Sequence, residues 1–398
     1  MQKHFDILFH MRNSNDIQKR IDELIQLAFV AVAVAALLVI RGALFYYESF
    51  DYIHSLSRWT AQFREMTFFE GLGADVGNYN PLYMYILNII ARVNFPDLYL
   101  IKIVSVFFDL VIAYFAMKLI SLKTSSLNMQ ILAFLLAFAI PTVILNGAMW
   151  GQCDSIYTAF VLGSLYFALS GKSKLAYSFI GIALAFKLQA AFMFPLFAVF
   201  IFTKKIRFRD CYFFLIAYIA TLIPAMIAGR PIMETLMVYF NQTGTYLHLN
   251  MNAVNIWRFF VNVEFEPFRT VGLFVGGVAV LGLLYFTYVH REHLTETKDF
   301  IRLAYLFAVI VPFLLPQMHD RFFFMADVLS VSVFLFDKRR WYVPLVTVFC
   351  SFLTYAWLIM GFETLIDYRW AALALTAVIF IVLRDYVTSL MSSDNSDN

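Results

Sequence analysis

The sequence predicts an all-α polytopic integral membrane protein with about twelve membrane helices (roughly 10–13), each about 20 residues long. Three observations carry this prediction. Of the 398 residues, 62% are hydrophobic and only 14% are charged, whereas soluble domains are about half apolar and about a quarter charged. Apolar runs long enough to span a bilayer recur along the whole chain. Loops that are rich in Lys and Arg alternate along the chain with loops that are poor in them, as the positive-inside rule requires.

Each expected span is an apolar run bounded by polar residues. The uninterrupted runs fall at 23–44, 98–121, 128–146, 154–170, 211–229, 270–289, 300–316, 321–336, 342–360 and 369–386. The longer run 175–203 exceeds the length of one span and is interrupted by "FKLQ". We therefore expect two short helices there, meeting at Lys187.

The basic residues predict the orientation of the chain in the cell membrane. Most of the 30 Lys and Arg residues lie in short loops that alternate with the spans, and such loops face the cytoplasm. Both termini are then cytoplasmic, and two long loops, 45–97 and 230–269, face outward. We expect one transmembrane domain over 1–386 and a polar cytoplasmic tail over 387–398.

The first outer loop is predicted to be structured. Ile53, Leu56, Trp59 and Phe63 recur at helical spacing, which is typical of an amphipathic helix lying in the membrane interface. The apolar stretch that follows Pro81 is too short to span a bilayer. It predicts a second interfacial helix.

Polar side chains of mixed type gather on the predicted outer side, and the densest group is His319-Asp320-Arg321 in a tight connection between two spans. Charged groups near membrane segments are costly and indicate functional sites. Arg and Lys at helix ends can bind phosphate, and a carboxylate can deprotonate a hydroxyl. The group therefore favours a site for a lipid-linked sugar phosphate. A solvated helix turn is the alternative.

Other classes of ligand find little support. The net charge of +3 is too small to indicate nucleic acid. The three cysteines show no metal-type spacing, and no dedicated cluster of metal ligands is visible. We expect no metal at the site, although the sequence leaves metal dependence open. Asp109 is expected to pair with Lys102, which lies on the same helix face.

Several motifs resemble the GT-C superfamily of polytopic glycosyltransferases, which take a sugar from a polyprenyl-phosphate carrier. "ESFDY" with "GNYNPLYMY" is similar to the catalytic-loop pattern, and "MWGQCDSI" resembles a Trp-Gly-Gln-x-Asp-Ser turn. "AFKLQAAFMFPL" resembles a Lys-x-Gln hairpin, "NAVNIW" a piece of the later outer loop, and "PQMHDRFFFMADVLS" a Met-His-acid-Arg-aromatic motif. The matches follow the family order over most of the chain.

The resemblance implies roles for the outer residues. Asp51 is implied as the general base, Glu48 competes with it, and Asp154 would position the reactants. Helix capping is the structural alternative for both Asp51 and Asp154, and for Lys187 it is snorkelling to the interface. The implied donor-phosphate ligands are Lys187, His319, Arg321 and Arg41. The implied sugar- and acceptor-binding residues are Trp59, Gln152, Gln189, Asn252, Asn255 and Trp257. Asp327 could orient the His319 ring or make a core contact.

The implied activity is inverting transfer of a hexose, of mannose or glucose type, from a polyprenyl-phosphate donor to a cell-envelope glycan or lipid-linked acceptor on the extracytoplasmic face. No cofactor is implied, and the partners are the bilayer and these two substrates. A polysaccharide polymerase or ligase is one alternative, but a dominant late loop would be expected there. A lipid-linked sugar flippase is the other, but such transporters show repeats and mid-membrane sites.

Overall fold

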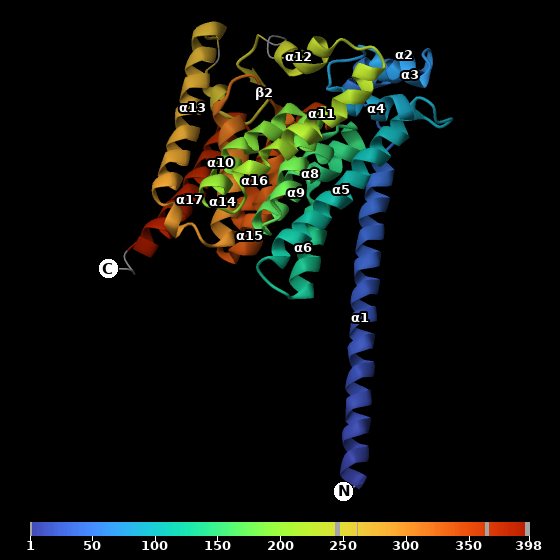
Figure 1. The fold of residues 1–398 in the computed structure, drawn as a ribbon, viewed down its shortest axis with the longest axis vertical. Coiled ribbons are helices and arrows are strands. Elements are labelled where there is room, and N and C mark those ends of the chain that lie inside the picture. Colours follow the sequence, from blue (N-terminus) through green and yellow to red (C-terminus); the bar gives the residue numbers. More distant parts are fainter. Residues whose placement is uncertain (1, 243–246, 261, 363–365, 395–398) are drawn as a thin grey trace.

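The computed structural model describes residues 2–242, 247–260, 262–362 and 366–394, and these residues form one helical bundle (Figure 1). The α-helices are α1 (Gln2–Leu44), α2 (Ser57–Arg64), α3 (Phe68–Gly73), α4 (Pro81–Ile90), α5 (Asp97–Ser121), α6 (Leu127–Ala139), α7 (Pro141–Ile144), α8 (Asp154–Leu169), α9 (Ser173–Phe186), α10 (Phe194–Phe202), α11 (Tyr212–Ile227), α12 (Ile232–Gln242), α13 (Phe265–Val289), α14 (Thr297–Leu314), α15 (Phe324–Phe336), α16 (Tyr342–Met360) and α17 (Tyr368–Asp394).

Short helices and one small pair of strands connect these helices. The π-helices are η1 (Tyr52–Leu56) and η2 (Leu145–Trp150), and the 3₁₀ helices are η3 (Leu188–Met193), η4 (Phe208–Cys211), η5 (Ile256–Phe259), η6 (Arg291–His293), η7 (Asp320–Phe323) and η8 (Lys338–Arg340). The strands β1 (Asn250–Met251) and β2 (Met318–His319) pair in parallel.

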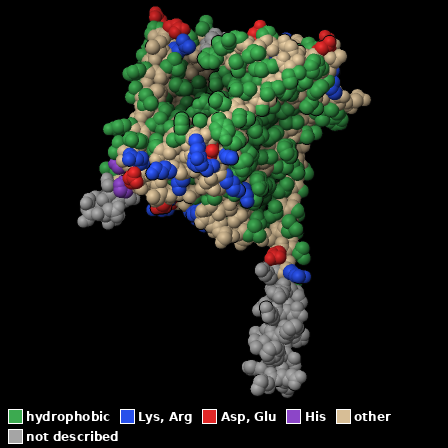
Figure 2. All heavy atoms as spheres, in the orientation of Figure 1, with side chains coloured by type: hydrophobic (Ala, Val, Ile, Leu, Met, Phe, Trp, Pro, Cys, Tyr) green, Lys and Arg blue, Asp and Glu red, His purple; other side chains and the backbone are tan. Residues whose placement is uncertain are grey.

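The predicted fold class is confirmed: the chain is an all-α polytopic membrane protein. Six described helices are long and apolar enough to cross a membrane, or seven if the bent pair α6 and 141–150 forms one span. The expected crossings at 154–170 and within 175–203 correspond to shorter apolar helices, namely α8, α9 and the segment 188–202. Those at 300–316 and 321–336 correspond to α14 and α15. Hydrophobic side chains cover most of the visible face between the acidic upper end and a basic band lower down (Figure 2).

One end of the bundle carries the two predicted outer loops. Helices α2, α3 and α12 and strand β2 gather there, whereas the N-terminus of α1 projects from the opposite end (Figure 1). The predicted amphipathic helix is present as η1 followed by α2, and α4 begins at Pro81 as expected. Helix α4 packs against α2, α9 and α11, so it closes one side of this end.

The predicted break at Lys187 is confirmed. Helix α9 ends at Phe186, and Lys187 is extended, with φ −156° and ψ 137°. The 3₁₀ turn η3 then leads into α10, whose second residue is Pro195. Pro has no backbone N–H to donate, so it is accommodated in the first turn of a helix. The break brings Lys187 to the bundle end that carries the outer loops.

The end of α1 is fixed by two buried cations, and here the prediction for Asp109 was wrong. The Arg41 Nε donates to the Asp109 carboxylate over 3.0 Å, and its guanidinium lies 3.8 Å from the centroid of the Phe138 ring. Lys102 instead donates to the carbonyls of Phe45 (2.9 Å) and Leu44 (3.3 Å). Helix ends leave such carbonyls unsatisfied, so Lys102 caps α1.

We expect Arg41→Met to destabilise the protein by about 3–5 kcal/mol, because it leaves the Asp109 carboxylate buried without its cation. The measurement is thermal unfolding of the purified protein in nanodiscs. The double variant Arg41→Met/Asp109→Asn is expected to recover most of the loss, since no uncompensated charge then stays buried. Equal melting temperatures for wild type and Arg41→Met would contradict this account of α1.

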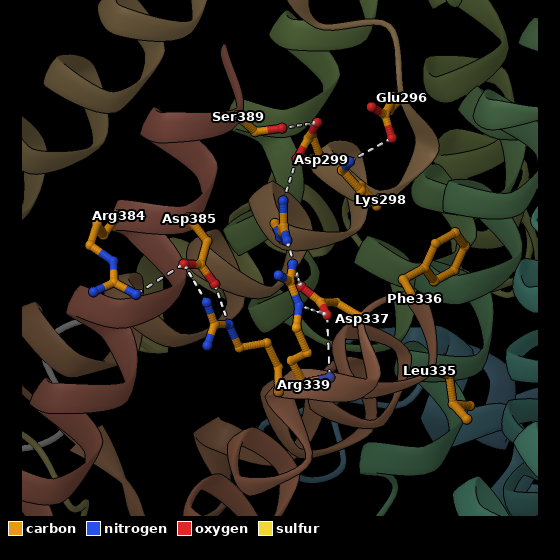
Figure 3. Close-up of polar contacts among 12 residues, drawn as sticks. Glu296, Lys298, Asp299, Leu335, Phe336, Asp337, Arg339, Arg384, Asp385 and Ser389 are labelled. Atoms are coloured by element: carbon orange, nitrogen blue, oxygen red, sulfur yellow. Dashed lines mark hydrogen bonds and ion pairs between the residues drawn. The ribbon is translucent and has the colours of Figure 1, made fainter. Parts of the chain in front are cut away.

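The opposite end is tied together by a network of ion pairs (Figure 3). Arg302 of α14 donates to Asp299 (2.8 Å) and to Asp337 (3.1 Å). Arg340 pairs with Asp385 of α17, to which its Nη2 donates over 2.7 Å. Helix α17 continues to Asp394, so it extends into the predicted polar tail, and residues 395–398 lie outside the described ones.

Candidate active site

A pocket of about 540 Å³ lies at the loop-bearing end, between the first predicted outer loop, the α9–η3 break at Lys187, α13 and the α14–α15 connection. Seven of the predicted site residues line it: Asp51, Trp59, Gln152, Lys187, Gln189, His319 and Arg321. Its remaining wall is partly apolar, with Leu188, Leu273 and Leu315. Charged groups therefore face an apolar surface across one pocket.

Asp51 is held by one carboxylate oxygen. The Trp150 indole donates to Oδ2 over 2.9 Å, and the Gln152 amide donates to the same oxygen. Arg321 Nη1 lies 3.8 Å from it. No hydrogen bond from the described residues reaches Oδ1, and the side chain is 32% exposed. Asp51 precedes η1 but makes no side-chain cap, so the capping alternative lacks support.

The two donors to Asp51 are positioned by the turn after η2. Gly151 adopts φ +79°, a left-handed conformation that glycine tolerates without strain. Ser49 Oγ donates to the Trp150 carbonyl over 2.7 Å, and the Gln152 backbone N–H donates to Asn146 over 3.0 Å. The turn thus directs the side chains on both sides of Gly151 at the same carboxylate. π-helices such as η2 occur frequently at functional sites.

Asp154 is fully buried, and both of its carboxylate oxygens accept hydrogen bonds. Lys187 donates to its Oδ1, Asn146 Nδ2 donates to Oδ2 over 3.0 Å, and Arg321 Nε lies 3.9 Å from Oδ2. Asp154 is the first residue of α8, whose N-cap is Cys153, so it is not the expected cap. Lys187 is 6% exposed and paired, so it does not snorkel to solvent.

Arg321 links several carboxylates beneath the pocket. It lies 3.8 Å from Asp51, 3.9 Å from Asp154 and 3.6 Å from Asp320. Its guanidinium also lies 5.2 Å from the centroid of the Trp150 ring, within cation–π range. Burial opposes the charge, but the carboxylates outweigh it and raise the pKa of Arg321. Because the Arg321 side chain is only 15% exposed, the His319-Asp320-Arg321 group is not a solvated turn.

His319 is neutral. Burial, reinforced by the nearby Arg321 and Lys187, lowers the pKa of His319 to about 3. The imidazole therefore offers hydrogen bonds rather than a positive charge. Asp327 accepts from Thr142 (2.8 Å) and Ser351 (2.9 Å), which is a core contact.

Arg269 of α13 lines the pocket and was missed by the sequence analysis. Its Nε donates to Gln317 Oε1 over 3.3 Å, and its Nη1 lies 3.4 Å from the exposed Glu266 carboxylate. An exposed pair of this kind stabilises by only about 0–1 kcal/mol, so the guanidinium remains available to a ligand. The sequence pointed to Arg269 in one way, since it directly precedes the predicted span 270–289.

The other predicted residues lie outside this pocket. Glu48 is exposed and Arg41 is buried against Asp109. Asn252 and Trp257 line a different pocket. Asn255 is buried and caps η5 by accepting from the Trp257 backbone N–H over 3.1 Å. In the described part of the chain, no group of three or more His, Cys, Asp or Glu residues is placed to hold a metal ion.

Comparison with known proteins identifies one family. The family model described as glycosyltransferase family 87 matches residues 78–316, more than half of the chain. The match includes Gln152, Asp154, Lys187 and Arg269, and it ends just before His319. No curated protein matches the chain.

Proposed function

Because the chain belongs to glycosyltransferase family 87, we propose that it transfers a hexose of mannose or glucose type from a polyprenyl-phosphate donor. The acceptor is a cell-envelope glycan or a lipid-linked glycan, and the reaction takes place on the extracytoplasmic face of the cell membrane. The distribution of basic residues supports this side, since the loops at the opposite end are the basic ones. Both termini are then cytoplasmic.

The observation that carries the proposal is the anchoring of Asp51. One oxygen is held by Trp150 and Gln152, the other accepts no hydrogen bond from the described residues, and the side chain lines the pocket. Such a carboxylate is oriented to accept a proton from an acceptor hydroxyl. As the acceptor oxygen bonds to the anomeric carbon from the face opposite the phosphate, the bond to the phosphate oxygen breaks. The lipid phosphate leaves with the bonding electrons, and the anomeric configuration inverts.

Charge balance supports a position for the donor phosphate at the rim of the pocket, beside Arg269. Lys187 is neutralised by Asp154, and Arg321 is shared among several carboxylates. Arg269 has only an exposed carboxylate partner, so it is the cation best able to form a bidentate contact with phosphate. Leu273, one turn further along the same helix, offers an apolar surface to the lipid chain. Gln189, whose buried Oε1 has no hydrogen-bond partner in the described residues, is suited to a sugar hydroxyl.

The reaction class is tested with purified protein in proteoliposomes that contain lipid extract as the source of acceptor. Radiolabelled polyprenyl-phosphate mannose and glucose are supplied separately, and the matching nucleotide sugars serve as comparison donors. We expect label to enter a glycolipid or glycan product only from a polyprenyl-phosphate donor. Transfer from a nucleotide sugar alone would overturn the proposed donor class while leaving the enzyme a glycosyltransferase.

We expect Arg269→Gln to raise the KM for the polyprenyl-phosphate donor by about 10- to 100-fold, because a hydrogen-bonded ion contact of this kind contributes roughly 1.5–3 kcal/mol. The kcat at saturating donor should change little. The matched control is Arg291→Gln, beyond the far end of the same helix, where the guanidinium stacks on Tyr288. Equal donor KM values for the two variants would remove Arg269 from the phosphate site.

A further inference from the structure

A second pocket, of about 1040 Å³, lies beside the first at the loop-bearing end of the bundle. Its walls come from the second outer loop, the last turn of α16 and the first turn of α17. The β1–β2 pair separates the two pockets: Met251 pairs with His319, which lines the first pocket, and Asn250 lines the second. Paired strands lie about 4.8 Å apart, so the shared wall is thin.

The walls of the second pocket combine aromatic rings with amides. The Trp357 and Phe260 side chains are 41% and 39% exposed, and Tyr368 lies under the Arg258 guanidinium, 4.7 Å from its ring centroid. The side chains of Asn250 and Asn252 supply planar amides. Rings with open faces beside hydrogen-bonding groups suit a ligand that is apolar on one face and hydroxylated at its edge.

The polar groups in this pocket argue against a lipid tail. Arg369 donates to Asp367 through Nε over 2.8 Å and through Nη2 over 2.5 Å, so its guanidinium is already neutralised. Arg258 Nε donates to the Ala253 carbonyl over 3.0 Å. A lipid tail would leave these polar groups without solvent, at a cost in free energy. A neutral polyhydroxylated ligand would not.

Two polar atoms in the walls are unsatisfied. Arg258 Nη2 and Asn250 Oδ1 have no hydrogen-bond partner in the described residues. One is a donor and the other an acceptor, and buried groups of this kind cost free energy unless they are paired. A hydroxyl can both donate and accept, so a ligand hydroxyl can pair with either atom once that side chain turns toward the pocket.

We propose that this second pocket binds a saccharide unit of the acceptor glycan, remote from the hydroxyl that reacts beside Asp51. The inference rests on the proposed function, because it presumes that the first pocket holds the donor. An oligosaccharide crossing the thin β1–β2 wall reaches both pockets. The enzyme then selects acceptors by length as well as by the sugar that is modified.

The test measures binding of the full-length protein in nanodiscs to an array of manno- and gluco-oligosaccharides of one to six units. We expect wild type to bind oligosaccharides better than monosaccharides, and Trp357→Ala to bind them at least 10-fold more weakly. Trp370→Ala is the matched control, since Trp370 is 68% exposed on the neighbouring helix and does not line the pocket. Phe260→Ala, which removes the other exposed ring of the pocket, provides a second weakened variant should Trp357→Ala fail to fold.

The outcomes separate this proposal from the proposed function. Absence of oligosaccharide binding by wild type, or equal binding by wild type and both pocket variants, overturns the second pocket while transfer from polyprenyl-phosphate hexose can still be observed. Loss of binding in the pocket variants supports the second pocket even where the donor assay fails.

Discussion

Asp51→Asn is expected to lower transfer by about 10²–10⁴-fold, the usual contribution of a general base. The amide keeps the shape of the carboxylate and can still accept from the Trp150 indole, so the fold should be retained. Transfer is measured in proteoliposomes at saturating donor, and melting temperature is measured on the same preparation. The loss should appear in kcat, because Asp51 acts on the acceptor proton during the reaction.

Variants of two other acidic residues test whether the loss of transfer is specific to Asp51. Glu48→Gln should leave transfer near the wild-type level, since Glu48 is exposed and does not line the pocket. Asp154→Asn should lower both transfer and stability, because it leaves Lys187 buried without its carboxylate. Full activity in Asp51→Asn combined with inactivity in Glu48→Gln would move the base to Glu48.

Arg321→Met is expected to abolish transfer and to destabilise the protein by about 3–5 kcal/mol, because the substitution leaves buried carboxylates without their cation. Arg321→Lys keeps the charge but loses the planar fork that reaches Asp51, Asp154 and Asp320 together. This second variant should retain most of the stability while its kcat falls about 100-fold, a loss of roughly 2.7 kcal/mol in transition-state stabilisation.

The control for Arg321 is Arg64→Met. Arg64 also pairs with a carboxylate at the same end of the bundle, Asp97 at 3.2 Å, but its side chain is 43% exposed. Exposed pairs contribute about 0–1 kcal/mol, so stability should change little. If Arg321→Met melted like Arg64→Met, the carboxylates around Arg321 would not depend on its charge.

The sequence was sufficient for the features set by local pattern. Apolar runs and basic loops predicted the membrane fold, the interruption at "FKLQ" predicted the bend at Lys187, and helical spacing predicted the η1–α2 segment. These features depend on residues that are close in the chain. The order of the predicted spans also placed the candidate site residues at one end of the bundle, and seven of these residues line one pocket.

Contacts between distant segments could not be predicted in this way. The pairing of Met251 with His319 depends on two strands too short to show a period, and it sends Asn252 and Trp257 to a separate pocket. Likewise, Arg41 points to Asp109 because of how α1 meets α5. Arg269 resembled an ordinary interfacial arginine, and only the packing of α13 brings it to the pocket.

The way α1 is attached has a consequence for how its sequence can change. Over its apolar window none of the side chains is buried in the protein, and Val34 and Leu37 pack only partly buried against the main core. Lipid is therefore the main neighbour of this stretch, and lipid tolerates any apolar side chain of suitable length. Selection on α1 should preserve its hydrophobicity and span but not its residue identities, until Arg41. At Arg41 the buried pair with Asp109 requires an arginine.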